Sequence, residues 1–134
     1  MEIERDEFRT TTFDEGSGIL ELDWTDATAR MTDAQFRAAL ERFASHSVVH
    51  KSPNVLIDVT RFAHQMSPEV GAWRDEHVIP RYIQAGVQKM AFLLPAGVPG
   101  TVESGNLPAQ QGAATFPTGY FNSRQAVLDW FAAD

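Results

Sequence analysis

The sequence predicts a single α/β domain in which helices pack on a mixed β-sheet. Segments typical of strands and of helices alternate along the chain, and this alternation is characteristic of layered α/β folds. Two apolar runs are continuous, as in strands that are covered on both faces. The length of 134 residues is the usual size of one domain, so we expect one domain spanning residues 1–134.

The first two predicted strands form an antiparallel hairpin. Residues Phe8–Asp14 are rich in Thr and Phe, which favour strands. Residues Ile19–Trp24 alternate apolar and polar side chains from Leu20 on, which is typical of a half-buried strand. Between them, Glu15–Gly18 supplies turn residues. We expect one face of this hairpin to be exposed and acidic.

The first predicted helix begins at Thr32. The Thr-x-x-Gln pattern of Thr32–Gln35 matches a capping box. Four apolar residues then fall on one helical face: Phe36, Leu40, Phe43 and Ala44. We expect this helix to end near Ser47.

Two buried strands are predicted at Asn54–Val59 and Lys89–Leu94, because both are short, nearly unbroken apolar runs. A helical segment joins them, so the two strands should run parallel. Six side chains are expected to be buried: Val55, Leu56, Ile57, Ala91, Phe92 and Leu93.

The helix between these strands has Ser67 as its N-cap and Pro68 at its first position. Its expected inner face consists of residues at spacings of 4, 3 and 4: Met66, Val70, Trp73 and His77. Pro80 cannot donate a hydrogen bond to the Glu76 carbonyl, which predicts a kink or a break. Gly86 is a natural C-terminal stop.

The last part of the chain begins with a loop. Residues Pro95–Ala114 include four glycines and three prolines, and a loop of this length is usually functional or mobile. A short strand is expected at Phe116–Phe121. A final helix opens at Asn122–Gln125, and three of its side chains share a face: Val127, Trp130 and Phe131.

Composition excludes several classes of function. The absence of cysteine rules out disulfides, thiol catalysis and thiolate zinc sites. The net charge is −7, and ten of the 18 acids lie in the first 33 residues, with no basic stripe for nucleic acid or anionic membranes. The apolar runs are too short to span a membrane, and the N-terminus lacks a secretion signal, so we expect a cytoplasmic protein.

Neither a metal nor a cofactor is expected. His46 and His50 have the i, i+4 spacing of a helical metal site, but the helix should be ending there and no third ligand lies near in sequence. Gly16–Gly18 precedes a strand rather than a helix, so it is not a phosphate-binding loop.

Polar residues gather at the carboxyl end of the central strand, where open α/β sheets tend to bind ligands: Asp58, Arg61, His64 and Ser67. An Asp, His and Ser together suggest a hydrolase, but the Gly-x-Ser-x-Gly pattern is absent. We favour structural roles, with Asp58 bound to backbone N–H groups, Ser67 as a cap and His64 solvated. Trp73, His77 and Tyr82 could line a ligand pocket or belong to the core.

Several strings of the sequence resemble the SpoIIAA-like group of STAS/SEC14 domain proteins, which have the STAS fold: Pro53–Asp58, Trp73–Glu76, Ile79–Arg81, Ala85–Phe92 and Tyr120–Phe131. The resemblance extends from about Gly18 to the C-terminus. It implies a non-enzymatic, regulatory module that binds a protein partner or a small apolar ligand.

In the anti-sigma-factor antagonists of this fold, a phosphorylatable serine sits at the place where this chain has Ser67. The surrounding Met66–Glu69 lacks their Asp-Ser-Ser-Gly-like motif, so we expect Ser67 to be an unmodified cap. The alternatives are a weak hydrolase-type enzyme using Asp58, His64 and Ser67, and a self-associating structural domain. A homodimer is expected only because two-fold dimers are the commonest assemblies.

Overall fold

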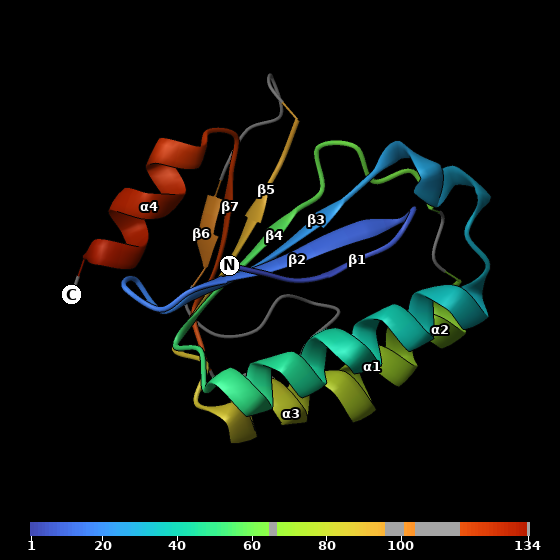
Figure 1. The fold of residues 1–134 in the computed structure, drawn as a ribbon, viewed down its shortest axis with the longest axis horizontal. Helices are drawn as coiled ribbons and strands as arrows, with labels where there is room; N and C mark the ends of the chain where they lie inside the picture. The colour runs from blue at the N-terminus through green and yellow to red at the C-terminus, as the bar shows by residue number, and fades with distance from the viewer. Residues whose placement is uncertain (65–66, 96–100, 104–115, 134) are drawn as a thin grey trace.

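The computed structural model describes residues 1–64, 67–95, 101–103 and 116–133, which form a mixed seven-stranded sheet with helices on both faces (Figure 1). The strands are β1 (Glu2–Arg5), β2 (Arg9–Asp14), β3 (Ile19–Trp24), β4 (Asn54–Asp58), β5 (Lys89–Leu93), β6 (Thr101–Glu103) and β7 (Thr118–Phe121). The helices are a 3₁₀ turn η1 (Asp26–Arg30), α1 (Asp33–His50), α2 (Pro68–Trp73), a π-helical turn η2 (Arg74–Val78), α3 (Ile79–Ala85) and α4 (Arg124–Ala132).

The strand order is β1-β2-β3-β4-β5-β7-β6. The predicted hairpin is confirmed, since β2 and β3 pair antiparallel. The predicted parallel pairing of β4 with β5 is confirmed, and β3 and β4, which are also joined through a helix, are parallel as well. Two strands were not expected. Three of the four residues of β1 are charged, which hides its strand character, and β6 lies inside the predicted loop Pro95–Ala114. Most of that loop is outside the described residues.

Two hydrophobic cores lie on opposite faces of the sheet. On one face, α1 and the α2–η2–α3 stretch run side by side and cover the main core, which contains Leu20, Leu22 and Phe43 (Figure 1). On the other face, α4 covers a smaller core of Leu56, Ala91, Leu93 and Val127. Of the six side chains expected to be buried, five are buried, and Phe92, which lines the cavity described below, is partly exposed.

The helix α1 begins as the sequence predicts. The Thr32 hydroxyl accepts a hydrogen bond from the Gln35 N–H at 3.1 Å, and the Gln35 side-chain oxygen accepts one from the Thr32 N–H at 2.9 Å. The helix continues three residues past Ser47 to His50, where Lys51 adopts the left-handed conformation that ends it. Among the helices of the described residues, none is long and apolar enough to cross a bilayer.

The second helical stretch is widened at Pro80 rather than broken. The Ile79 N–H donates to the Arg74 carbonyl five residues earlier, which is the hydrogen bond of a π turn. This turn changes which side chains face the sheet. Val78, Ile79 and Tyr82 are buried, whereas the His77 side chain is 62% exposed, so the expected inner stripe does not continue to His77.

The alternation of β3 places Leu22 in the main core. Truncating Leu22 should therefore lower the stability much more than truncating an exposed leucine. Leu22 is fully buried in the main core, so Leu22→Ala should lower the free energy of unfolding by about 2–5 kcal/mol. Leu128 is 37% exposed on α4, so Leu128→Ala should cost about 1 kcal/mol or less. Urea denaturation of both variants measures the difference. Equal losses would contradict the assignment of Leu22 to the main core.

Candidate functional site

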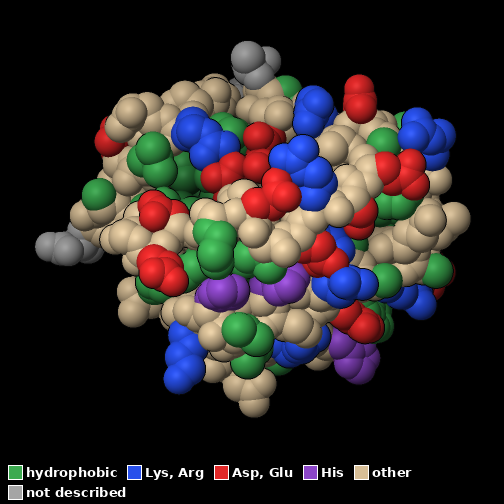
Figure 2. Space-filling model, in the orientation of Figure 1, with side chains coloured by type: hydrophobic (Ala, Val, Ile, Leu, Met, Phe, Trp, Pro, Cys, Tyr) green, Lys and Arg blue, Asp and Glu red, His purple; other side chains and the backbone are tan. Residues whose placement is uncertain are grey.

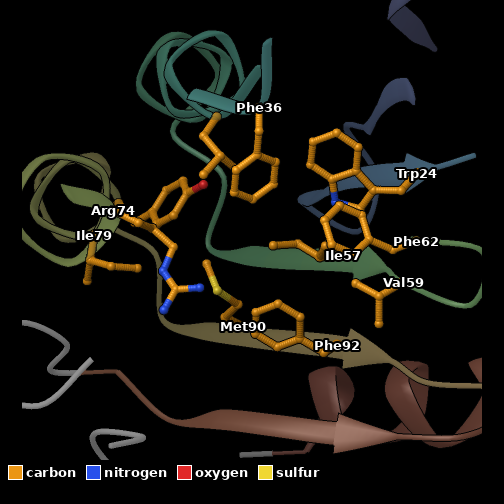
Figure 3. A pocket seen from close by; sticks show the side chains of 11 residues that line it. Trp24, Phe36, Ile57, Val59, Phe62, Arg74, Ile79, Met90 and Phe92 are labelled. Atoms are coloured by element: carbon orange, nitrogen blue, oxygen red, sulfur yellow. The ribbon is translucent and has the colours of Figure 1, made fainter. Parts of the chain in front are cut away.

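A cavity of about 190 Å³ lies between the helical layer and the sheet, near the carboxyl ends of the central strands (Figure 3). Eleven residues line it: Trp24, Phe36, Leu40, Ile57, Val59, Phe62, Arg74, Ile79, Tyr82, Met90 and Phe92. The alternation of side chains along the strands explains which residues of the sheet line the cavity. Ile57 and Val59 are two residues apart, as are Met90 and Phe92, so each pair points to the same face.

Aromatic side chains form one wall of the cavity. The ring of Trp24 lies 5.6 Å from that of Phe36 and 5.2 Å from that of Phe62, measured between centroids. The rings of Phe36 and Phe62 are 5.7 Å apart. All three pairs are tilted, in the range where aromatic pairs attract one another. This wall is apolar, and its three rings pack against one another.

Arg74 and Tyr82 bring polar groups into the lining of the cavity. Arg74 extends from η2 into the cavity between Ile79 and Met90 (Figure 3). Tyr82 comes from α3 and is 2% exposed. Burial raises the pKa of the Tyr82 hydroxyl well above its usual range, and the charges of Arg74 and Arg81 offset only part of this. The hydroxyl is therefore neutral and able to donate a hydrogen bond.

Asp58 and His64 have separate partners. Asp58 accepts hydrogen bonds from the Thr60 N–H at 2.9 Å and the Thr60 hydroxyl at 2.6 Å, as in a turn. Because Ile57 and Val59 face the cavity, Asp58 points to the opposite face of the sheet. His64 Nε2 lies 2.9 Å from a carboxylate oxygen of Asp33, and its ring packs on Phe36. Its side chain is 8% exposed, so the expected solvation of His64 is wrong.

The other predicted site residues lie around the cavity rather than in its wall. Ser67 is the N-cap of α2, and its hydroxyl accepts a hydrogen bond from the Val70 N–H at 3.3 Å. Arg61 is exposed in a turn. The Arg37 guanidinium lies over the ring of Trp73, which in turn is 6.2 Å from the ring of His77. Of the seven predicted residues, Tyr82 is the one that lines the cavity.

His46 and His50 point to different neighbours. His46 Nε2 lies 3.0 Å from Glu4, and His50 packs on Phe13. Burial alone would raise the pKa of Glu4, but hydrogen bonds from His46 and Arg9 and the charges of Arg9 and Arg42 lower it to about 2. In the described ranges, no three His, Asp or Glu side chains converge as a metal site requires. In Figure 2, basic and acidic side chains are interspersed on the face shown.

A group of carboxylates lies on the α4 face of the sheet. Arg124 donates two hydrogen bonds to Glu21, at 2.8 and 2.6 Å. Asp23 is beside Glu21 and pairs in register with Asp58 on the neighbouring strand. Burial, a hydrogen bond with Glu21 and the charges of Glu21 and Asp58 raise the pKa of Asp23 to about 8. Asp23 is therefore mostly protonated at neutral pH.

Sequence reasoning missed most of the cavity. Trp24, Phe36 and Ile57 were recognised as apolar residues of regular elements, but nothing in the pattern indicates that the helices leave a space over them. Phe62 lies in an irregular segment without periodicity. Arg74 could have been found, because it lies four residues from both Val70 and Val78 and so shares their inner face.

Comparisons with known proteins give no relative for this chain. No family model matches it, and no curated protein sequence and no solved structure is similar enough to count as a match. The geometry of the cavity is therefore the basis on which we infer a function.

The raised pKa of Asp23 predicts that the stability of the protein depends on pH. Its pKa is near 3.9 in an unfolded chain and about 8 in the folded one, so the folded state binds the proton more tightly. Its contribution to stability is complete below pH 4 and is lost as the pH rises toward 8. Asp23→Asn keeps a neutral donor beside Glu21, so the variant should gain stability relative to the parent protein across this window.

Urea denaturation at several values between pH 5 and 9 measures this gain, with exposed Asp26→Asn as the matched control. Comparing each variant with the parent at the same pH cancels the titration of the histidines. A gain for Asp23→Asn that does not change with pH would show that Asp23 is ionised throughout.

The capping role of Ser67 predicts that its substitution changes the stability of the protein and leaves ligand binding unchanged. Removing its hydroxyl leaves the Val70 N–H without its capping partner, so Ser67→Ala should lower the free energy of unfolding by about 0.5–2 kcal/mol. Ser67→Asp restores a capping oxygen and should recover most of the loss. Urea denaturation measures both variants, and an unchanged midpoint for Ser67→Ala would contradict the capping role.

Proposed function

We propose that this chain is a non-enzymatic binding module that encloses a small apolar ligand in the cavity beneath α1 and the α2–η2–α3 stretch. The observation that carries the proposal is the cavity itself, with about 190 Å³ of space and a largely aromatic and aliphatic lining. An apolar protein cavity of roughly 150 Å³ is large enough to bind benzene. The space therefore suits a ligand with one aromatic ring or a short branched chain.

The polar chemistry around the cavity supports binding over catalysis. A hydrolase would need Asp58, His64 and Ser67 to converge within hydrogen-bonding distance of one another. Instead, Asp58 binds Thr60, His64 pairs with Asp33 and Ser67 caps α2. The resemblance to the SpoIIAA-like proteins supports the same choice, because it implies a STAS-type module that binds rather than converts its ligand.

The segment after β4 forms one side of the cavity and is the expected route of entry. Val59 and Phe62 from this segment line the space. The Val59 N–H donates to the Leu93 carbonyl at 3.0 Å, and the Ala63 N–H donates to the Thr28 hydroxyl at 2.8 Å. A ligand can enter if Phe62 swings out while these backbone anchors stay in place.

Filling the cavity tests the proposal. The neutral probe 3-phenyl-1-propanol should bind the parent protein in isothermal titration calorimetry, because its phenyl ring fits against the aromatic wall. Val59→Phe places a ring inside the cavity and should weaken this binding at least about tenfold, the equivalent of losing one buried aromatic contact. Val49→Phe makes the same change on the exposed surface of α1 and should have no effect.

Circular dichroism and urea denaturation establish that both variants are folded. Failure of the parent protein to bind the probe, or equal binding by the Val59→Phe and Val49→Phe variants, would contradict the cavity as the binding site.

A further inference from the structure

We infer that the ligand is an uncharged molecule whose aromatic or apolar body carries one carbonyl group, and that the Tyr82 hydroxyl donates a hydrogen bond to this carbonyl. This inference rests on the proposed function and specifies its ligand. The apolar lining selects the body of the ligand, and the single hydroxyl among the eleven lining residues selects its acceptor group.

The Tyr82 hydroxyl is buried without a hydrogen bond to the described residues. Tyr82 is 2% exposed. Burial is the largest influence on the pKa of its hydroxyl, the charges of Arg74 and Arg81 act against it, and no hydrogen bond contributes. Buried polar groups nearly always have a hydrogen-bond partner, and leaving one unpaired lowers stability. A ligand that supplies the missing partner removes this cost.

The Tyr82 side chain is held in one position. Its backbone carbonyl accepts a hydrogen bond from the Val87 N–H at 3.1 Å. Its ring meets the ring of the fully buried Phe43 at an angle of 72°, with centroids 6.1 Å apart. A donor fixed in this way loses little conformational entropy when a ligand binds, so its hydrogen bond contributes more to affinity.

The surrounding charges favour a donor role for the hydroxyl. Arg74 and Arg81 lower the pKa of Tyr82, which means that they make its proton easier to share. The same positive charges repel a ligand N–H or O–H group that approaches the hydroxyl oxygen. A carbonyl oxygen carries two lone pairs and no proton, so it matches this site.

The apolar surroundings favour an uncharged ligand, because burying an ionised group costs far more than burying a carbonyl. Phe36 from α1 and Met90 from β5 reach toward the same space, so the body of the ligand contacts apolar side chains from both layers (Figure 3). Arg74 is the charged residue of the lining, and it already interacts with other groups of the protein. The hydrogen bond from Tyr82 needs no contribution from it.

Three probes of nearly equal shape test the inference. They are acetophenone, α-methylstyrene and benzoate, which attach a carbonyl, a C=CH₂ group and a carboxylate to the same phenyl ring. Titrations followed by the amide NMR signals of the protein measure each dissociation constant. Acetophenone should bind the parent protein about tenfold more tightly than benzoate, because only benzoate has to bury a charge.

Two matched tyrosine variants assign the effect. Tyr82→Phe keeps the ring and removes the hydroxyl, so it should weaken acetophenone binding about tenfold and leave α-methylstyrene binding unchanged. Tyr120→Phe is the control. The Tyr120 ring stacks on Phe92 with centroids 5.2 Å apart but does not line the cavity, so this variant should bind both probes as the parent does.

Stability gives an independent readout of the same hydroxyl. Because the Tyr82 hydroxyl lacks a described partner, Tyr82→Phe should not lower the midpoint of urea denaturation. Thr28→Val is the contrasting control, since the Thr28 hydroxyl donates to the Thr25 carbonyl at 2.7 Å and accepts from the Ala63 N–H at 2.8 Å. It should lower the midpoint. A clear loss of stability in Tyr82→Phe, or failure of this variant to fold, would show that the protein itself uses the hydroxyl and would overturn the inference.

The binding outcomes separate this inference from the proposed function. If Tyr82→Phe changes the binding of acetophenone and α-methylstyrene equally, or changes neither, the carbonyl inference is overturned and the apolar site stands. Tighter binding of benzoate than of acetophenone to the parent protein would overturn the choice of an uncharged ligand. Failure of both neutral probes to bind the parent protein would contradict the proposed function as well.

Discussion

The alternation of side chains along β3 and β4 determines how the two faces of this molecule differ. Leu20, Leu22 and Trp24 point to the main core, so Glu21 and Asp23 must point to the α4 face. The same rule sends Ile57 into the cavity and Asp58 away from it. The sheet thus separates an apolar cavity on one face from a group of interacting carboxylates on the other.

The helical stretch that borders the cavity opposite α1 is not a regular helix. Pro80 removes one backbone donor, and the π turn η2 accommodates it without breaking the stretch. The cavity is bordered by α1 through Phe36 and Leu40, and by η2 and α3 through Arg74 and Tyr82.

The sequence predicts regular elements well and the cavity poorly, for physical reasons. The capping box at Thr32 and the cap at Ser67 depend on neighbouring residues, so local patterns reveal them. The pairing of His64 with Asp33 joins residues 31 positions apart, and no local pattern encodes it. A cavity is harder still to predict from sequence, because it depends on where two layers fail to pack closely. The periodicity of the sequence does not describe this.

The strand β1 bears on how copies of the chain can associate. It lies at one edge of the sheet, and an edge strand offers unpaired backbone groups to any second chain. Here the strand is only four residues long, its pairing with β2 is irregular between Glu2 and Glu4, and Glu2 and Arg5 form an exposed ion pair. These features oppose strand addition at this edge. They therefore disfavour a dimer that extends the sheet from β1.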